Sequence, residues 1–166
     1  MASRFAKLGL TLVLASALPA LAGCGFTPLY AEPGVVQGMS GIEVRTPRTR
    51  TGHLLREELE DAFAVKRGGR PAYRLTVQME DRRRARGLNP DDTPTRYEQR
   101  LDVTYTLTRL PGGEVVLKQT KPVFVTADAS YEPYAGIVAQ QDSEARAAGE
   151  TAEMIRTDVA LALRPQ

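Results

Sequence analysis

Strict alternation between apolar and polar residues in the middle of the chain constrains its fold more than any other feature. Every second residue is apolar in residues 73–79 and again in residues 101–107. A period of two is typical of β-strands that bury one face. Residues 111–113, Pro-Gly-Gly, form a tight connection, and a further strand over residues 115–127 completes a hairpin. Pro122 cannot donate to a strand ladder and therefore indicates an edge or a bulge.

Helical spacing of apolar residues occurs on both sides of these strands. Thr51 is a candidate N-cap for a helix that residues 68–71, Gly-Gly-Arg-Pro, bring to an end. A second helix is expected from about residue 137 to 163. Its apolar stripe consists of Val138, Ala145, Ala148, Ala152, Ile155 and Val159.

A short strand over residues 42–44 completes the element order β-α-β-β-β-α. This order predicts an α+β fold in which two helices pack on one face of a four-stranded mixed sheet. The other face would be polar and rich in threonine. It would carry Thr76, Gln78, Thr104, Thr106, Thr108, Thr120 and Thr126. Antiparallel sheets commonly leave one face in water, so solvation explains this pattern as well as a binding role does.

Residues 1–23 have the organisation of a bacterial secretory signal. Arg4 and Lys7 precede a charge-free apolar run over residues 8–21, which is shorter than the roughly 20 residues of a transmembrane helix. The sequence Leu-Ala-Gly before Cys24 resembles a lipobox, after which the cysteine becomes the first mature residue and is acylated. Cys24 is the only cysteine. A secreted protein with an incidental cysteine and an uncleaved anchor are the alternatives.

Three segments are therefore expected. Residues 1–23 form a lipoprotein signal peptide, residues 24–40 a lipidated extended tether rich in Pro and Gly, and residues 41–166 a single α+β domain. Two or more acyl chains anchor a protein stably. Gly25 takes the place of the Asp that resembles an inner-membrane retention signal. We therefore expect the protein to be lipid-anchored at the periplasmic face of the outer membrane.

The composition offers little material for catalysis. His53 is the only histidine, and no other cysteine is left once Cys24 is acylated. Metal-binding motifs of His and Cys and Gly-rich phosphate loops do not occur in the sequence. We therefore expect no enzymatic activity, no cofactor and no bound metal. Without residues 1–23 the chain has 20 basic and 20 acidic side chains, so net charge gives no reason to expect nucleic acid as a partner.

Basic residues concentrate in the middle of the chain. Residues 66–109 carry eleven basic and six acidic side chains, and the densest run is residues 82–86, Arg-Arg-Arg-Ala-Arg. In a continuous strand, Arg82, Arg84 and Arg86 share the polar face with Arg74, while Arg83 points toward the helices. Guanidinium groups bind phosphate and carboxylate in bidentate fashion. The alternative is a solvated strand end whose charges only prevent edge pairing.

Two runs resemble a known family, the alphaproteobacterial type of the lipopolysaccharide (LPS)-assembly lipoprotein LptE. Residues 24–30, Cys-Gly-Phe-Thr-Pro-Leu-Tyr, resemble the beginning of the mature family members. Residues 134–146, Tyr-Ala-Gly-Ile-Val-Ala-Gln-Gln-Asp-Ser-Glu-Ala-Arg, are similar to the start of the family's last helix. Between these runs, the order of strands and helices also fits the family.

The resemblance implies a scaffold role. LptE is the lipoprotein partner of the outer-membrane β-barrel LptD, inside which it sits as a plug, assists assembly and binds LPS. A polar sheet face suits such a place because the lumen of a membrane barrel is polar. Our assignment of LPS contacts to Arg82, Arg84 and Arg86 rests on their clustering, since the family supplies no motif for them.

Two other function classes stay open at this point. The chain would also suit a substrate-binding accessory lipoprotein of an envelope lipid transporter, which would associate with an inner-membrane complex. An envelope hydrolase would need an acid–base site that the sequence does not reveal. The partner that accompanies the protein discriminates among these classes.

Overall fold

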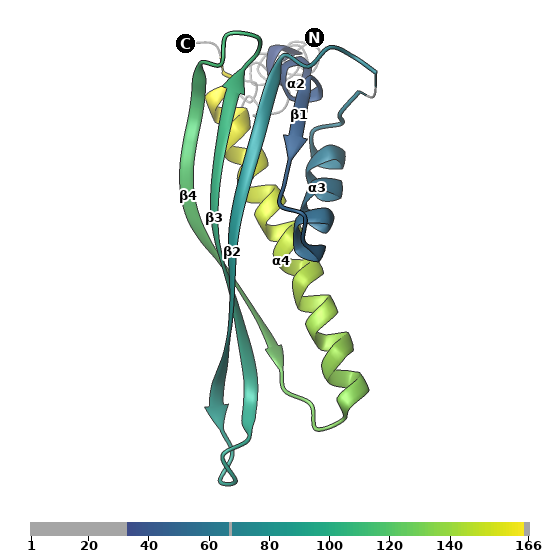
Figure 1. Ribbon diagram of the computed structural model, residues 1–166, viewed down its shortest axis with the longest axis vertical. Coiled ribbons are helices and arrows are strands. Elements are labelled where there is room, and N and C mark those ends of the chain that lie inside the picture. Colours follow the sequence, from purple (N-terminus) through teal and green to yellow (C-terminus); the bar gives the residue numbers. More distant parts are fainter. Residues whose placement is uncertain (1–32, 67, 165–166) are drawn as a thin grey trace, which may run out of the picture.

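The computed structural model describes residues 33–66 and 68–164 as one elongated α+β body (Figure 1). Its elements follow in the order α2 (Pro33–Ser40), β1 (Ile42–Arg45), α3 (Arg50–Ala62), β2 (Tyr73–Leu88), β3 (Pro94–Arg109), β4 (Val115–Asp128) and α4 (Pro133–Ala162). The predicted signal peptide and Cys24 lie outside the described residues. None of the helices in the described part is both long and apolar enough to cross a membrane.

The four strands form one mixed sheet in the order β1-β2-β3-β4. β1 pairs with β2 in parallel, and α3 is the crossover between them, whereas β2, β3 and β4 are antiparallel neighbours. The predicted α+β fold with helices on one face of a mixed sheet is confirmed. Pro122 lies in β4, an edge strand, as its missing backbone donor requires.

The β2–β3 hairpin is longer than the sequence suggested. The polar residues 86–94 were expected to form a loop, but β2 continues to Leu88 and β3 begins at Pro94. Gly87 makes this possible, because its φ of +67° is a left-handed conformation that favours glycine. A Cβ at this position would also collide with Thr95 Oγ1 on the facing strand. Cross-strand pairing therefore supports charged residues whose composition alone indicates a loop.

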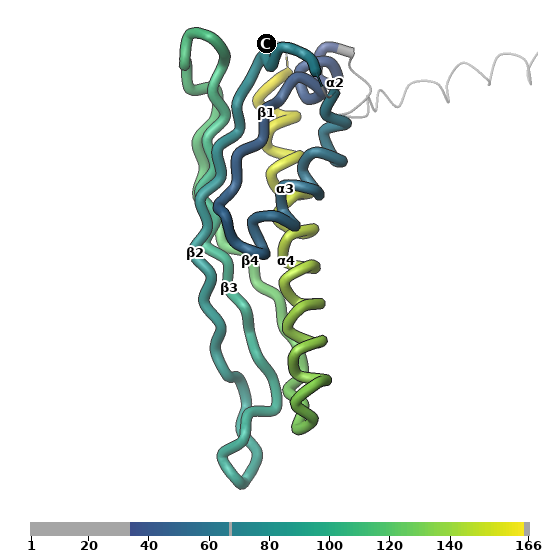
Figure 2. Tube along the Cα trace, turned by 45° about the vertical axis from the view of Figure 1, so that its right-hand side comes forward, coloured from purple at the N-terminus to yellow at the C-terminus, as the bar shows by residue number. Residues whose placement is uncertain are grey.

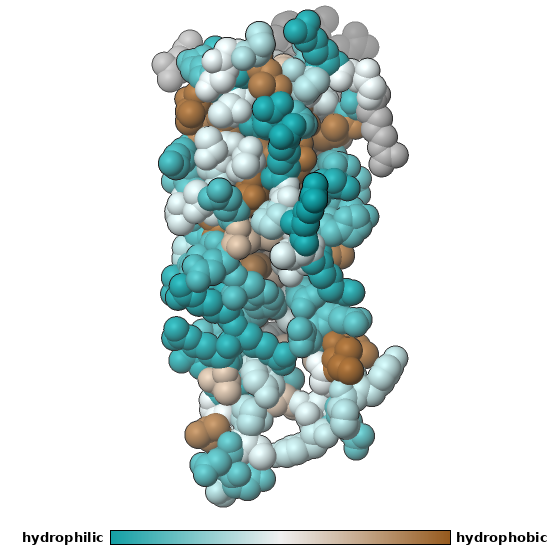
Figure 3. Space-filling model, viewed as in Figure 1, coloured by the Kyte–Doolittle hydropathy of each residue, from teal (hydrophilic) through white to brown (hydrophobic). Residues whose placement is uncertain are grey.

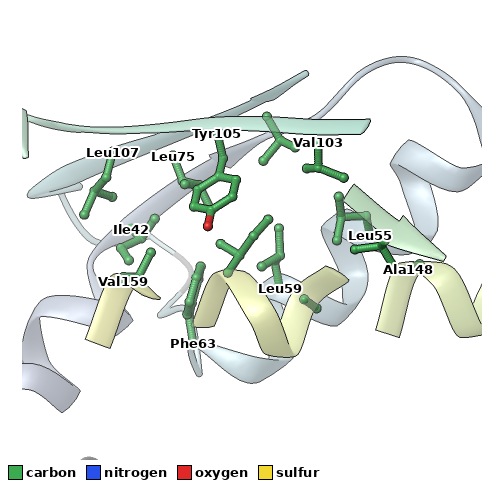
Figure 4. Packing of buried hydrophobic residues seen from close by; sticks show 14 of the residues in the cluster. Ile42, Leu55, Leu59, Phe63, Leu75, Val103, Tyr105, Leu107, Ala148 and Val159 are labelled. Atoms are coloured by element: carbon green, nitrogen blue, oxygen red, sulfur yellow. The ribbon is translucent and has the colours of Figure 1, made fainter. Parts of the chain in front are cut away.

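The hydrophobic core lies between the sheet and the helices α3 and α4, which cover the same face (Figure 2). Tyr105 and Leu75 point from the strands toward Phe63 and Leu59 of α3 (Figure 4). All four are at most 2% exposed. The period of two that predicts strands therefore reflects real burial of alternate residues beneath two helices. The N-cap of α3 is Thr49, whose hydroxyl accepts from the amide of Gly52, and not Thr51 as expected.

Helix α2 corrects part of the predicted tether. Residues 33–40 were expected to be extended, but they form a helix with Val35 and Met39 buried in the core. These two residues are four apart and therefore share one helix face. Their burial stabilises a helix that its two glycines, Gly34 and Gly38, disfavour on their own. Residues 24–32 of the predicted tether lie outside the described residues.

The buried stripe of α4 differs from the predicted one at its N-terminal end. Ala148, Ala152, Ile155 and Val159 are buried as expected, but Val138 is 47% exposed and Ala145 is exposed. The helix begins at Pro133, and its first turns extend beyond the part of the sheet that it covers (Figure 1). Helical period identifies the face of a helix but not the point at which its partner ends.

A polar contact ties α4 to β3 and β4 at the edge of the core. The Tyr105 hydroxyl and the Lys121 ammonium both donate to Asp158 Oδ2. Partial burial opposes ionisation of Asp158, but these two donors outweigh it and lower the pKa of the carboxyl. Burial and the neighbouring carboxylate raise the pKa of Tyr105, which therefore stays a donor.

We predict that Asp158 makes stability depend on pH in the acid range. Because its pKa is lowered by folding, its contribution is complete above the ordinary Asp value of about 4 and disappears as pH falls through the lowered pKa. Asp158→Asn should reduce the free energy of unfolding at pH 7 by about 1–3 kcal/mol, the range for a hydrogen bond to a charged group. It should also flatten the acid limb of a urea-denaturation series.

Asp142→Asn is the matched control on the same helix, because the Asp142 side chain is exposed and pairs only with Arg146 four residues on. An exposed pair of this kind contributes little to stability. Equal effects of the two substitutions across the pH series would contradict the proposed role of the Asp158 contact.

Candidate functional site

The sheet face that the helices do not cover is the candidate functional surface. All seven expected polar residues, from Thr76 to Thr126, lie on this face in the strand register. Threonines face each other across the strands, and the hydroxyls of Thr104 and Thr120 are 3.0 Å apart. Toward the hairpin the threonines give way to rows of charged side chains, seen as a hydrophilic band in Figure 3. The surface is therefore polar along its whole length.

The register places Arg82, Arg84 and Arg86 on this face of β2, as expected from the period of two. Their partners on β3 are Arg100, Glu98 and Arg96, respectively. The predicted trio is thus part of a group of five arginines from two strands. β3 contributes two arginines that a search for clusters along the sequence did not include.

Acidic side chains neutralise most of these arginines. The ion pairs are Arg82–Glu80 at 2.7 Å, Arg86–Glu98 at 2.8 Å, Arg96–Asp128 at 3.2 Å and Arg100–Asp102 at 2.7 Å. The hydrogen bonds from Arg100 lower the pKa of Asp102, so that this carboxylate is charged at neutral pH. The face therefore carries alternating charges and only a small positive excess.

Arg84 stands apart from this pattern. It is exposed and forms no ion pair with any residue in the described part of the chain. The neighbouring row contains Arg82, Arg100 and Phe124, and the Arg100 guanidinium lies 5.4 Å from the centre of the Phe124 ring. Phe124 is 50% exposed on an otherwise polar face. Arg84 and Phe124 together offer a free cation and an apolar ring to a ligand.

Arg83 has a different role from its neighbours, because it points to the helix side as expected. Its guanidinium stacks on the Tyr97 ring, 4.0 Å from the centroid. Arg83 Nη1 also donates to Gln140 Oε1 of α4 at 2.9 Å. Beside these groups lies a hollow of about 200 Å³, bounded by Pro133 and Ile137 of α4. Arg83 thus links the hairpin to the start of α4.

The described residues provide no arrangement typical of catalysis. His53 is exposed in the first turn of α3, 3.4 Å from the Glu57 carboxylate. No group of three or more His, Cys, Asp or Glu side chains in residues 33–66 and 68–164 is placed to hold a metal ion. The geometry of the polar face can bind, through charges and a ring, but it places no nucleophile beside a base.

Comparisons with known proteins give both fold and family. A candidate lipoprotein from Caulobacter crescentus CB15 has a crystal structure with a TM-score of 0.69 and 40% sequence identity, covering 80% of this chain and 99% of that one. The rare lipoprotein B from Shewanella oneidensis has the same fold at 17% identity, with a TM-score of 0.53, covering 72% of this chain and 97% of that one. No curated protein matches the sequence significantly.

Fold and sequence therefore define an accessory lipoprotein of LPS assembly. The LptE family model, described as lipopolysaccharide-assembly, matches residues 38–159. The chain belongs to the LptE family, and the predicted family resemblance is confirmed. The match includes both strands of the hairpin and nearly all of α4, and thus the whole candidate surface.

Proposed function

We propose that this protein is an outer-membrane lipoprotein that plugs and assists the assembly of the LptD β-barrel and binds LPS during its transport to the cell surface. The continuous polar face of β2, β3 and β4 carries this proposal. A wide membrane barrel has a polar interior, and a sheet face of threonines and alternating charges is compatible with that interior. Membership in the LptE family supports the same role.

The proposed anchor is an acylated Cys24. A single acyl chain binds membranes only marginally, whereas two or more hold a protein stably. Nine residues separate Cys24 from the start of α2 at Pro33, a distance of at most about 30 Å when fully extended. The body of the protein would therefore stay within this distance of the leaflet that holds its lipid.

LPS binding is proposed for the charged half of the polar face. Phosphates are bound well by guanidinium groups, and an ion pair within the protein competes with such binding. Because Arg82 and Arg86 already pair with Glu80 and Glu98, Arg84 is the strongest candidate of the three predicted residues. The exposed ring of Phe124 would contact an apolar part of the same ligand.

We predict that replacing Arg82 and Arg84 by Glu weakens LPS binding without unfolding the domain. Arg84→Glu alone should produce most of the loss, and the loss should shrink at high salt because exposed charges are screened. Titration of labelled LPS into the purified protein measures the affinity, and circular dichroism checks the fold. Arg48→Glu makes the same charge change at an exposed site away from the face, and equal losses in both would refute a specific role for Arg84.

We predict that purification of the lipidated protein from membranes recovers a large β-barrel partner in about one-to-one amount. Mass spectrometry of the purified material identifies that partner. Recovery with an inner-membrane transporter complex, and without a barrel, would instead support the accessory role in another lipid transporter. Recovery of the protein alone would contradict the plug.

We predict that Cys24→Ala leaves the fold intact but releases the protein from the membrane fraction. The substitution removes the acyl chains and alters nothing in the core, which lies entirely within residues 33–164. Fractionation after a high-salt wash measures attachment, because salt removes proteins held by charge alone. Retention of the variant after this wash would show that acylation is not the anchor.

A further inference from the structure

A pocket of about 400 Å³ lies at the end of the body where α2 and the start of β1 meet. Gln37 and Ser40 of α2 form one side, and Ile42 of β1 and Val65 contribute apolar surface. The rim contains Lys66, whose amide donates to the carbonyl of Ser40 at 3.2 Å. The polar face described above lies on other strands, and the proposed function leaves this pocket without a role.

The exposed face of α2 leads directly to the pocket. Val35 and Met39 fix the opposite face of this helix in the core. Val36 and Ser40 are one turn apart on the outer face. Val36 is 48% exposed, so apolar surface continues from the helix toward the pocket that Ser40 lines. A short apolar segment lying along α2 would cover both.

The sequence supplies such a segment directly before α2. Residues 26–30, Phe-Thr-Pro-Leu-Tyr, carry no charge and end only two residues before Pro33. They lie outside the described residues. When extended, the run from residue 26 to residue 30 spans about 14 Å, and the eight residues of α2 are about 12 Å long. A reversal at residues 31 and 32 would therefore lay the run along the whole outer face of the helix.

We propose that residues 26–30 fold back along α2 and fill this pocket. The pocket combines apolar walls with the polar groups of Gln37, Ser40 and Glu43. A tyrosine suits such walls because its ring is apolar and its hydroxyl needs a hydrogen-bond partner. Leu29 and Tyr30 are the residues of the run that lie nearest to the reversal and hence to α2.

The consequence concerns how the body is held at the membrane, and this consequence alone rests on the proposed lipidation of Cys24. With residues 26–30 packed, only Gly25 separates the acylated residue from the folded body. The α2 end would then lie against the membrane. The tip of the β2–β3 hairpin, at the opposite end of the body (Figure 1), would point away from it. A fixed orientation replaces a flexible leash.

Engineered disulfides test the contact in the lipidated full chain, which has no second cysteine of its own. The pairs Leu29→Cys with Ser40→Cys and Tyr30→Cys with Gln37→Cys should oxidise readily, because a disulfide needs Cα atoms within about 7 Å. Leu29→Cys with Val138→Cys, at the other end of the body, should stay reduced. Failure of both test pairs, or equal oxidation of the control, would overturn the proposal.

Hydrogen exchange provides a second readout on the same protein. Leu29→Ser with Tyr30→Ser should speed exchange of the Lys66 amide about tenfold or more, because local opening sets its protection. Tyr131→Ser with Tyr134→Ser, which are exposed at the far end, should leave that amide unchanged. An unchanged Lys66 amide in the first variant would overturn the proposal.

The same experiments distinguish a lipid occupant and a missing anchor. If delipidation of the wild type removes the protection at Lys66 while residues 26–30 stay intact, an acyl chain fills the pocket and the proposal is wrong. The intact mass of the preparation reports whether Cys24 is acylated. A protein that is packed but not acylated would refute the anchor alone and leave the packing in place.

Discussion

Burial of one face of a long antiparallel sheet beneath α3 and α4 is the interaction on which the rest of this structure depends. Because side chains alternate across a strand, burying one face fixes every other residue of β2, β3 and β4 on the opposite face. The core residue Tyr105 and the surface residue Thr104 are thus placed by one and the same contact. A one-residue slip would exchange the two faces, so the core also determines the register of the polar surface.

The charges of this surface are organised across strands as well as along them. Arg82 faces Arg100 on β3, and each is balanced by an acid two residues away on its own strand. Individually these exposed pairs contribute little stability. Together they keep arginine-rich strands from repelling each other and leave Arg84 as the side chain without a counter-ion in the described residues. A nearly neutral, hydrated face with one free cation fits the plug and LPS-binding roles that we propose.

The two ends of the elongated body differ in character. At the α2 end the chain enters the fold, and a pocket lies beside that entry point. At the hairpin end, Tyr131 contacts Asn89 and joins the β4–α4 connection to the turn. Most of the residues that resemble the family's last helix, including the exposed Tyr134 and Ile137, lie at this second end. The distinctive sequence of the chain is therefore concentrated at its ends, and the middle is defined by periodicity.

The sequence by itself determined the α+β class, the three long strands and the polar face, because periods of two and 3.6 record which side chains are buried. It also indicated the lipoprotein class through residues 21–24. Only the tertiary structure decided that residues 33–40 are helical, since Val35 and Met39 need the core to stabilise them. Likewise, cross-strand partners decided the charge of the candidate site. Glu98 neutralises Arg86 from another strand, and a pairing between residues twelve apart depends on register, which local sequence does not specify.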